Sequence, residues 1–259
     1  MSPDSSRSGW GLSPENELVT DALVIIPTFN ESSTLAEIIK RTRAVTSMDI
    51  LIVDDNSPDG TGALADELSA SDPSIHVLHR SAKEGLGPAY IAGFRWALGR
   101  GYRFVAEMDA DGSHDPASLV TLLDIAENTV AALVLGSRWV RGGAIDGWSR
   151  NRELLSRAGN AYARLALGSR INDLTGGFRV ISTDALRQLD LSTISSSGYS
   201  FQIEVAHRIE STGATIIEHP ITFHERTSGV SKMHIGIVVE AVWRITLWGF
   251  TRLVGFRRL

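Results

Sequence analysis

Cysteine is absent from this sequence of 259 residues, and its absence excludes disulfides, thiolate catalysis and zinc sites with cysteine ligands. Basic residues do not exceed acidic ones, and the net charge of −5 argues against a nucleic-acid partner. The N-terminus lacks the apolar run of a signal peptide, and its Ser, Pro and Gly content indicates a disordered leader over residues 1–20. These features predict a cytoplasmic protein.

Two nucleotide-binding motifs are missing as well. A dinucleotide-binding Rossmann domain requires G-x-G-x-x-G directly after its first strand, and the corresponding residues 27–31 contain no glycine. Gly85 and Gly87 lack a third glycine at the right step, and we interpret them as a flexible turn. No G-x-x-x-x-G-K-[ST] phosphate loop exists. A metal-dependent nucleotidyltransferase is disfavoured too, because it usually has a Gly-rich loop after strand one.

Short apolar runs alternate regularly with helical stretches. The expected strands are residues 22–27, 50–54, 75–79, 104–108 and 132–136. The expected helices between and after them are residues 32–43, 61–69, 88–100 and 116–128. This alternation predicts an α/β fold with a mostly parallel sheet flanked by helices. The second half is less regular, with helices expected at 150–167 and 199–211 and a strand at 215–221.

Acidic residues follow three of the expected strands. Glu31 follows the first strand, Asp54 and Asp55 end the second, and Asp109 and Asp111 follow the fourth. Ligands of open α/β sheets bind beyond the carboxyl ends of the strands, where these side chains would gather. If the segment is extended, Asp109 and Asp111 point to the same side, which suits one metal ligand and one ligand for a sugar or ribose hydroxyl. Each pair alone could instead cap a helix or form a turn, but together they favour a binding site.

These motifs resemble the inverting glycosyltransferases of family two, which have the GT-A fold, and among them the dolichol- or polyprenol-phosphate mannose synthases. The resemblance covers residues 22–232 and is carried by Pro27-Thr28-Phe29-Asn30-Glu31, Asp54-Asp55-Asn56-Ser57-Pro58-Asp59-Gly60-Thr61, Asp109-Ala110-Asp111, Gly85-Leu86-Gly87, Gly136-Ser137-Arg138, Gly147-Trp148, Asp173-Leu174-Thr175-Gly176-Gly177-Phe178-Arg179 and Arg226 with Ser231-Lys232. The fold class implied is a GT-A domain over residues 21–232.

The resemblance also implies roles for individual residues. The guanine nucleoside of the donor would contact Pro27, Phe29, Glu31, Val53 and Asp55. Asp109 and Ala110 would line the sugar–nucleotide site, Asp111 would bind Mg²⁺ or Mn²⁺, and Ser113 falls where some relatives have a further metal-side ligand. Arg226 and Lys232 match a loop that closes over the donor phosphates, and Arg138 and Arg152 are the candidates for binding the acceptor phosphate.

The implied reaction moves mannose from GDP-mannose to a polyprenyl phosphate. A phosphate monoester has a second pKa of about 6, so it needs no general base, and a metal plus arginines can align the two charged reactants. Three alternatives stay open, namely UDP-glucose as donor, a hydroxyl acceptor that would need a carboxylate base, and a non-catalytic nucleotide-sugar binding subunit.

Several further residues have two interpretations each. His114 is expected to pack or cap rather than to bind metal. Asp173 and Arg179 form either a structural pair or a substrate contact, and Glu204 belongs either to helix packing or to the site. Trp139 and Trp148 either pack in the interior or contact an apolar lipid chain.

The C-terminal segment, residues 233–259, is predicted to form an amphipathic helix over 235–256. Glu240, Arg244 and Arg252 interrupt it, so we expect an interfacial helix on the membrane rather than a span, with Arg257 and Arg258 near anionic headgroups. The alternative is a helix packed on the protein itself or on a membrane-anchoring partner subunit. The chain is therefore predicted to be peripheral on the cytoplasmic face of the membrane.

Overall fold

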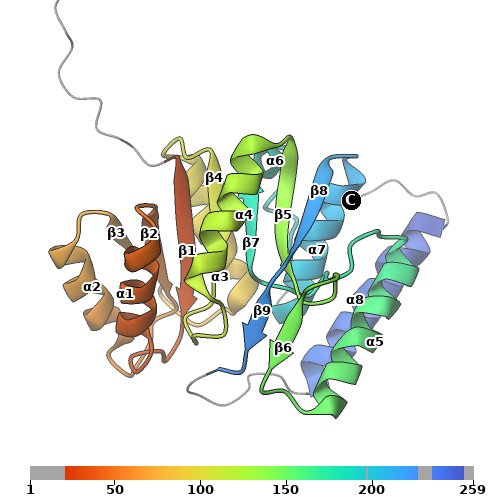
Figure 1. The fold of residues 1–259 in the computed structure, drawn as a ribbon, viewed down its shortest axis with the longest axis horizontal. Coiled ribbons are helices and arrows are strands. Elements are labelled where there is room, and N and C mark those ends of the chain that lie inside the picture. The colour runs from red at the N-terminus through yellow and green to blue at the C-terminus, as the bar shows by residue number, and fades with distance from the viewer. Residues whose placement is uncertain (1–20, 197, 227–234, 254–259) are drawn as a thin grey trace, which may run out of the picture.

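The computed structural model describes residues 21–196, 198–226 and 235–253, so the leader, Lys232, Arg257 and Arg258 lie outside the described residues. A seven-stranded sheet with the order β3-β2-β1-β4-β7-β5-β8 forms the centre of the molecule (Figure 1). Its strands are β1 Ala22–Thr28, β2 Asp49–Asp54, β3 Ile75–His79, β4 Phe104–Glu107, β5 Ala131–Ser137, β7 Arg179–Ser182 and β8 Thr215–Pro220. A second, two-stranded parallel sheet pairs β6 Ala144–Asp146 with β9 Thr222–His224.

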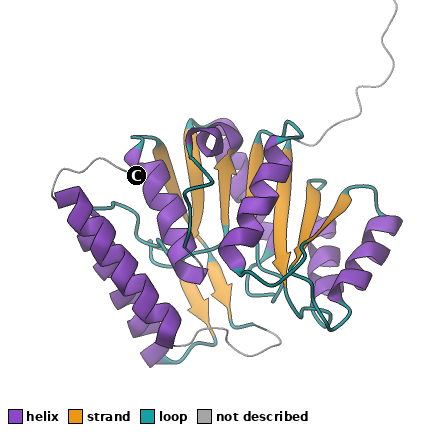
Figure 2. Cartoon of the chain, turned by 180° about the vertical axis from the view of Figure 1, so that it is seen from behind, coloured by secondary structure: helices purple, strands orange, loops and turns teal. Residues whose placement is uncertain are grey.

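Helices cover both faces of the main sheet, which makes the fold a three-layer α/β sandwich (Figures 1 and 2). One layer holds α1 Leu35–Val45, α2 Thr61–Ser71 and α4 Pro116–Asn128. The other holds α3 Leu86–Leu98, α6 Thr183–Gln188 and α7 Gly198–Ser211. Two long helices, α5 Arg150–Leu167 and α8 Ile235–Leu253, lie side by side at the β8 end of the sheet. The mostly parallel sheet flanked by helices confirms the predicted fold class.

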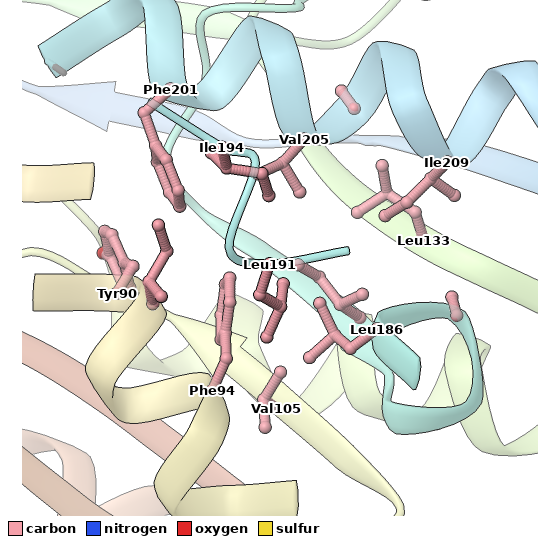
Figure 3. Close-up of a cluster of buried hydrophobic side chains, with 14 of the residues drawn as sticks. Tyr90, Phe94, Val105, Leu133, Leu186, Leu191, Ile194, Phe201, Val205 and Ile209 are labelled. Carbon is pink, nitrogen blue, oxygen red and sulfur yellow. The ribbon is translucent and has the colours of Figure 1, made fainter. Parts of the chain in front are cut away.

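Burial on both faces explains the continuous apolar runs of the parallel strands. In β1, Leu23 and Ile25 belong to the core under α3 and α7, whereas Val24 and Ile26 belong to the core under α1 and α4. Figure 3 shows the first of these cores, where Tyr90 of α3 faces Phe201 of α7; their ring centroids are 5.8 Å apart and the rings are nearly parallel. Apolar burial of this kind dominates folding stability.

Strand β7 was not predicted, and it changes what reaches the carboxyl edge of the sheet. It runs antiparallel between β4 and β5, with Arg179 paired in register to Glu107 on one side and to Leu135 on the other. Because its direction is reversed, its first residue lies beside the carboxyl ends of the parallel strands. The segment that precedes β7, residues 173–178, is thereby delivered to the same edge as the acidic loops.

Candidate active site

The loops after β1 and β2 are fastened to each other by hydrogen bonds to Asp54. This buried carboxylate accepts from Thr28 Oγ1 at 3.1 Å and from Ser57 N–H and Oγ at 3.1 and 2.5 Å. Asn30 N–H in turn donates to Ser57 Oγ at 3.1 Å. Asn30 and Asn56 both have φ of 58°, a left-handed conformation that asparagine tolerates better than most residues. Asp54 therefore holds the two loops in place rather than facing a ligand.

Asp55 also lies beneath a loop, the one that follows β3. Its carboxylate is hydrogen-bonded by Arg80 and accepts from the backbone N–H groups of Glu84 and Gly85 at 3.3 and 3.2 Å. Gly85 has φ of 102°, and a Cβ on Gly87 would approach Ser196 O to 2.5 Å. The interpretation of these glycines as a flexible turn is therefore wrong, because the positive φ favours glycine at position 85 and the close approach to Ser196 requires it at position 87, inside α3.

The remaining residues expected to contact the donor nucleoside differ in how far their side chains are exposed. Phe29 is half-buried, and Lys83 Nζ lies 3.9 Å from its ring centroid. Glu31 accepts a hydrogen bond from Thr34 Oγ1 at 3.3 Å, and Pro27 is partly exposed. The side chain of Val53 is fully buried in the core under α3, so Val53 can contact a ligand through its backbone alone.

The Asp109–His114 segment is a turn and not an extended strand, with φ of 78° at Gly112. We expected the side chains of Asp109 and Asp111 to point to the same side of an extended segment. That expectation is wrong, because the segment is not extended. The turn is closed by Asp109 N–H, which donates to His114 Nδ1 at 3.1 Å, and by Ser113 N–H, which donates to Asp111 Oδ1 at 3.0 Å. Ala110 is buried at the base of this turn.

His114 has a packing role, in line with the expectation from the sequence. Its ring stacks on Phe178 at 4.7 Å between centroids. Burial lowers the pKa of His114 to about 4 and outweighs the opposing effect of Asp111, so the ring is neutral at pH 7. Its Nδ1 accepts from Asp109 N–H, which places the ring proton on Nε2.

Asp111 is a buried carboxylate with a positive charge beside it. Burial raises its pKa, but hydrogen bonding from Ser113 and the positive charge of Arg226 outweigh burial and lower the pKa below the ordinary value. Arg226 Nη2 lies 3.4 Å from Asp111 Oδ2. Asp111 is therefore ionised at neutral pH, and the loop after β9 brings an arginine to it.

The surroundings of Asp111 fit a divalent cation of the Mg²⁺ or Mn²⁺ type. Ser113 Oγ is buried and has no hydrogen-bond partner among the described residues, so an oxygen next to Asp111 is available to a ligand. In the described part of the chain, no three His, Asp or Glu side chains converge into a complete metal cage. Mg²⁺ is commonly held by one or two carboxylates plus the phosphates of its substrate, and such a site needs few protein ligands.

Arg138 forms a buried ion pair with Asp173. Its Nε and Nη2 each donate to a carboxylate oxygen of Asp173 at 2.7 Å, and its backbone N–H donates to the same group at 3.0 Å. Nη2 also donates to Thr175 Oγ1 at 2.9 Å. Both side chains of the pair are buried. The bidentate geometry fixes the guanidinium at the end of β5.

The suggested pair of Asp173 with Arg179 is therefore wrong. Arg179 is fully buried and instead lies opposite Glu107, with 3.9 Å between Nε and Oε2, while its Nη1 donates to Gln202 O at 3.1 Å. Burial raises the pKa of Glu107 to about 7 against the opposing effects of Arg179 and of the hydrogen bond from Gln202. Glu204 belongs to helix packing, since it pairs with Arg208 one turn later at 2.6 Å.

Arg152 lies in the first turn of α5 and faces the loop that carries Arg226. Ser149 caps this helix by accepting from Arg152 N–H. The guanidinium carbon lies 4.0 Å from a ring centroid of Trp148, and Nη1 donates to Glu225 Oε1 at 3.1 Å. Trp148 is half-buried and also meets Phe223 edge to face at 5.4 Å. The side chain of Arg152 is 23% exposed, against 7% for Arg138.

Glu225 and Arg226 connect the two halves of the site, because adjacent residues contact Arg152 and Asp111. Sequence reasoning did not single out Glu225, nor did it single out Arg80 and Lys83 in the loop after β3. For the last two a signal existed: they directly follow a predicted strand, and ligands of such sheets bind beyond strand ends. For Glu225 none did, because β9 has three residues and no apolar run.

Helix α8 has apolar residues on its inner and on its outer side. Ile245 and Trp248 are buried in the core under α3 and α7. The polar residues Glu240 and Arg244 pair at 2.8 Å, and Arg244 also donates to Ser195 O at 3.2 Å, on the protein side. Trp243 and Phe250 are 68% and 63% exposed. The helix was expected either to lie on the membrane or to pack on the protein. One side of α8 packs on the protein, and the side that carries Trp243 and Phe250 stays exposed. Among the described helices, none is long and apolar enough to cross a membrane.

Taken together, a mostly parallel sheet with acidic loops at its carboxyl edge and a carboxylate–arginine contact suited to a metal–diphosphate group defines a nucleotide-sugar transferase of the GT-A type. The chain belongs to glycosyl transferase family 2, whose sequence model matches residues 23–190. The resemblance inferred from the motifs is thereby confirmed.

Two curated relatives are similar over nearly the whole chain. The undecaprenyl-phosphate mannosyltransferase of Micrococcus luteus is 52% identical over 228 residues, which are 88% of this chain and 93% of the relative. The polyprenol monophosphomannose synthase of Mycolicibacterium smegmatis is 47% identical over 250 residues, which are 95% of this chain and 94% of the relative.

Solved structures share the fold at low sequence identity. The mannosyltransferase PcManGT of Pyrobaculum calidifontis, in complex with GDP-Man and Mn²⁺, has a TM-score of 0.60 and 15% identity, covering 97% of this chain and 69% of that chain. Glucosyl-3-phosphoglycerate synthase of Mycobacterium tuberculosis, in complex with Mn²⁺, UDP and its product, has a TM-score of 0.61 and 18% identity, covering 98% and 88%. At these identities the likeness shows the GT-A fold alone.

Proposed function

We propose that this protein transfers mannose from GDP-mannose to the phosphate of a polyprenyl phosphate, with Mg²⁺ or Mn²⁺, at the cytoplasmic face of a membrane. The geometric observation that supports it best is the pair of contacts made by adjacent residues, Arg226 with Asp111 and Glu225 with Arg152. These contacts bring together Asp111, the carboxylate proposed to bind the metal of the donor, and Arg152, the arginine proposed to bind the acceptor phosphate. The two curated relatives at 47% and 52% identity carry names for this same chemistry.

The proposed reaction is a single inverting displacement. An oxygen lone pair of the acceptor phosphate forms the bond to the anomeric carbon of mannose, and the bond from that carbon to the diphosphate oxygen breaks, so that GDP leaves with the electron pair. The acceptor is largely a dianion at neutral pH, because the second pKa of a phosphate monoester is about 6. No proton has to be removed from it, and no residue of the site is assigned as a general base.

The protein contributes charge and alignment to this reaction. Asp111 and Ser113 Oγ would hold the divalent cation, which when bound neutralises the negative charge that develops on the leaving diphosphate. Arg226, 3.4 Å from Asp111, adds a second positive charge there. Lys232 stays a proposal for the donor phosphates. Arginine forks match phosphate oxygens. Arg152 is the more accessible of the two acceptor candidates, because its side chain is 23% exposed whereas that of Arg138 is 7% exposed and donates to Asp173 through Nε and Nη2.

Membrane association is the second part of the proposal, and α5 and α8 support it together. Tyr162 Oη and Thr246 Oγ1 are 2.6 Å apart, and a Cβ on Gly249 would approach Ala166 O to 2.8 Å, so the two helices pack tightly and run in the same direction. Their outward sides carry eight large apolar residues that are exposed, which we call the α5–α8 apolar face. Its members are Leu154, Leu155, Leu165, Val239, Val242, Trp243, Leu247 and Phe250.

The position of the α5–α8 apolar face suits an acceptor that is itself embedded in lipid. Helix α5 begins at Arg150, so Arg152 and the exposed Leu154 and Leu155 lie within its first two turns. A phosphate bound at Arg152 would therefore have its hydrocarbon chain leave toward apolar side chains. Large exposed apolar patches mark interaction surfaces, and a bilayer that contains the acceptor is the occupant we propose.

A transfer assay tests the reaction. Purified protein, Mg²⁺ or Mn²⁺ and a short polyprenyl phosphate are mixed with labelled GDP-mannose or, in a parallel reaction, with labelled UDP-glucose. We expect label to move into the organic phase from GDP-mannose and GDP, not pyrophosphate, to be released. Transfer from UDP-glucose alone would overturn the donor assignment. Metal-dependent nucleotide binding with no transfer from either donor would overturn the acceptor assignment.

Liposome flotation tests the membrane contact. The double variant Trp243→Glu/Phe250→Glu should lower the partition coefficient on vesicles with anionic lipid by more than about tenfold, since burying one large apolar side chain contributes about 1.5–3 kcal/mol. The matched control is Val120→Glu/Val130→Glu, which changes exposed apolar residues on and after α4, far along the sequence from the α5–α8 apolar face. Equal flotation of the wild type and both variants would contradict the proposal.

A further inference from the structure

We infer that Lys83 selects the base of the donor by binding the O6/N7 edge of guanine, an inference that rests on the proposed use of a guanine nucleotide. Three consecutive residues of the loop after β3 make the relevant contacts. Lys83 Nζ lies 3.9 Å from the ring centroid of Phe29, and the backbone N–H groups of Glu84 and Gly85 donate to Asp55 Oδ2 at 3.3 and 3.2 Å. An aromatic ring and an ammonium thus lie together at the carboxyl edge of the sheet, on a loop that is anchored to Asp55.

The position of Lys83 is set by the loop around it. Arg80 bonds to Asp55 on one side of the loop and to Glu84 on the other. Asn56 Nδ2 also donates to Ser81 O at 3.2 Å, which ties the loop to the segment after β2. The loop is therefore anchored on both sides of Lys83. These contacts hold the loop so that Lys83 lies over the ring of Phe29, just after the end of β1.

The chemistry of Lys83 matches guanine. A base that stacks on Phe29 would take the place over the ring that Lys83 Nζ occupies, and the displaced ammonium would then meet the edge of the base. Guanine offers two acceptors, O6 and N7, on one edge, and lysine or arginine on that edge is the commonest specific contact to guanine in proteins. Adenine has an amino group in place of O6. This amino group and the lysine ammonium are both hydrogen-bond donors, so they do not pair.

A rival role for Lys83 is a contact to the diphosphate, and the two roles differ in what a substitution changes. A phosphate contact contributes equally to every nucleoside diphosphate. A contact to O6 and N7 contributes fully to GDP and to inosine diphosphate, which keeps both acceptors and lacks the 2-amino group, and contributes less to ADP, which keeps N7 alone. The ratio of affinities within this set therefore separates reading of the base from general attraction by charge.

The experiment measures the binding of GDP, inosine diphosphate, ADP and UDP by calorimetry, with Mn²⁺, to the wild type and to Lys83→Met. We expect the preference for GDP over ADP to fall about tenfold, which is the lower range for one base contact, and inosine diphosphate to lose as much affinity as GDP. Lys83→Arg should retain most of the preference, because arginine donates to the same edge. Lys40→Met, an exposed lysine of α1, is the matched control.

An equal loss for GDP, ADP and UDP in Lys83→Met, or no change in any of them, would overturn the assignment of Lys83 to the base. The wild type separates this failure from a failure of the proposed function. If the wild type prefers UDP to GDP, the donor assignment falls; if it prefers GDP and Lys83→Met keeps the same preference, the donor assignment stands and the inference about Lys83 is wrong.

Discussion

Asp111→Asn is expected to lower kcat by at least about a hundredfold while leaving the protein folded. Substitution of residues that merely support metal ligands costs 10–100-fold in affinity or activity, so removing the charge of a ligand itself should cost at least the upper end of that range. The lowered pKa of Asp111 means that a carboxylate is present at neutral pH, and an amide in its place carries no charge to hold a cation or to face Arg226.

The fold should survive this substitution because the hydrogen bond from Ser113 N–H to residue 111 is preserved. The amide side chain of the variant would keep an oxygen that accepts from Ser113 N–H, as Asp111 Oδ1 does at 3.0 Å. Asp115→Asn is the matched control, since Asp115 caps α4 by accepting from Ala117 N–H and asparagine caps as well. Turnover is measured across Mg²⁺ and Mn²⁺ concentrations together with circular dichroism. Wild-type turnover in Asp111→Asn would remove Asp111 from the metal site.

The parallel half of the fold could be predicted because its central strands β1, β2 and β4 are buried on both faces. Strand β3 and helices α4 and α5 have the predicted bounds, β1 and β2 differ from them by one residue at one end, and β5 differs by one residue at each end. The carboxyl-edge rule then placed Asp55, Asp109 and Asp111 without any knowledge of their contacts. The argument for Asp109 and Asp111 on one side failed because it assumed an extended backbone where Gly112 makes a turn.

The antiparallel strand could not be predicted, because nothing local distinguishes it. Strand β7 has four residues, and its direction follows from pairing with β4 and β5 rather than from its own composition. That pairing also decides which acid meets which arginine. Arg138 and Asp173 are 35 positions apart, and spacing along the chain could not favour that pair over Asp173 with Arg179. The register that sets Arg179 opposite Glu107 is what leaves Asp173 for Arg138.

Because Asp173 is the carboxylate partner that the structure shows for a buried guanidinium, Asp173→Ala should lower the free energy of unfolding by about 3–5 kcal/mol, the usual cost of leaving a buried charge uncompensated. It removes both 2.7 Å hydrogen bonds from Arg138 and the acceptor of the Arg138 backbone N–H. Urea unfolding measures the loss. Glu153→Ala is the control, since the pair of Glu153 with Arg157 is exposed and should contribute less than about 1 kcal/mol.

A second substitution separates the charge from the loss of packing. Asp173→Ala leaves the guanidinium charge of Arg138 buried without its carboxylate partner. Adding Arg138→Met removes that charge, so the double variant should be more stable than Asp173→Ala alone. Replacing a buried pair by apolar groups is often neutral, whereas breaking it is costly, and this asymmetry is what the comparison measures. If Asp173→Ala is no less stable than Glu153→Ala, or if Arg138→Met destabilises it further, the guanidinium does not depend on Asp173. In that case the end of β5 is held by Thr175, Asn160 and the aromatic rings around Arg138 instead.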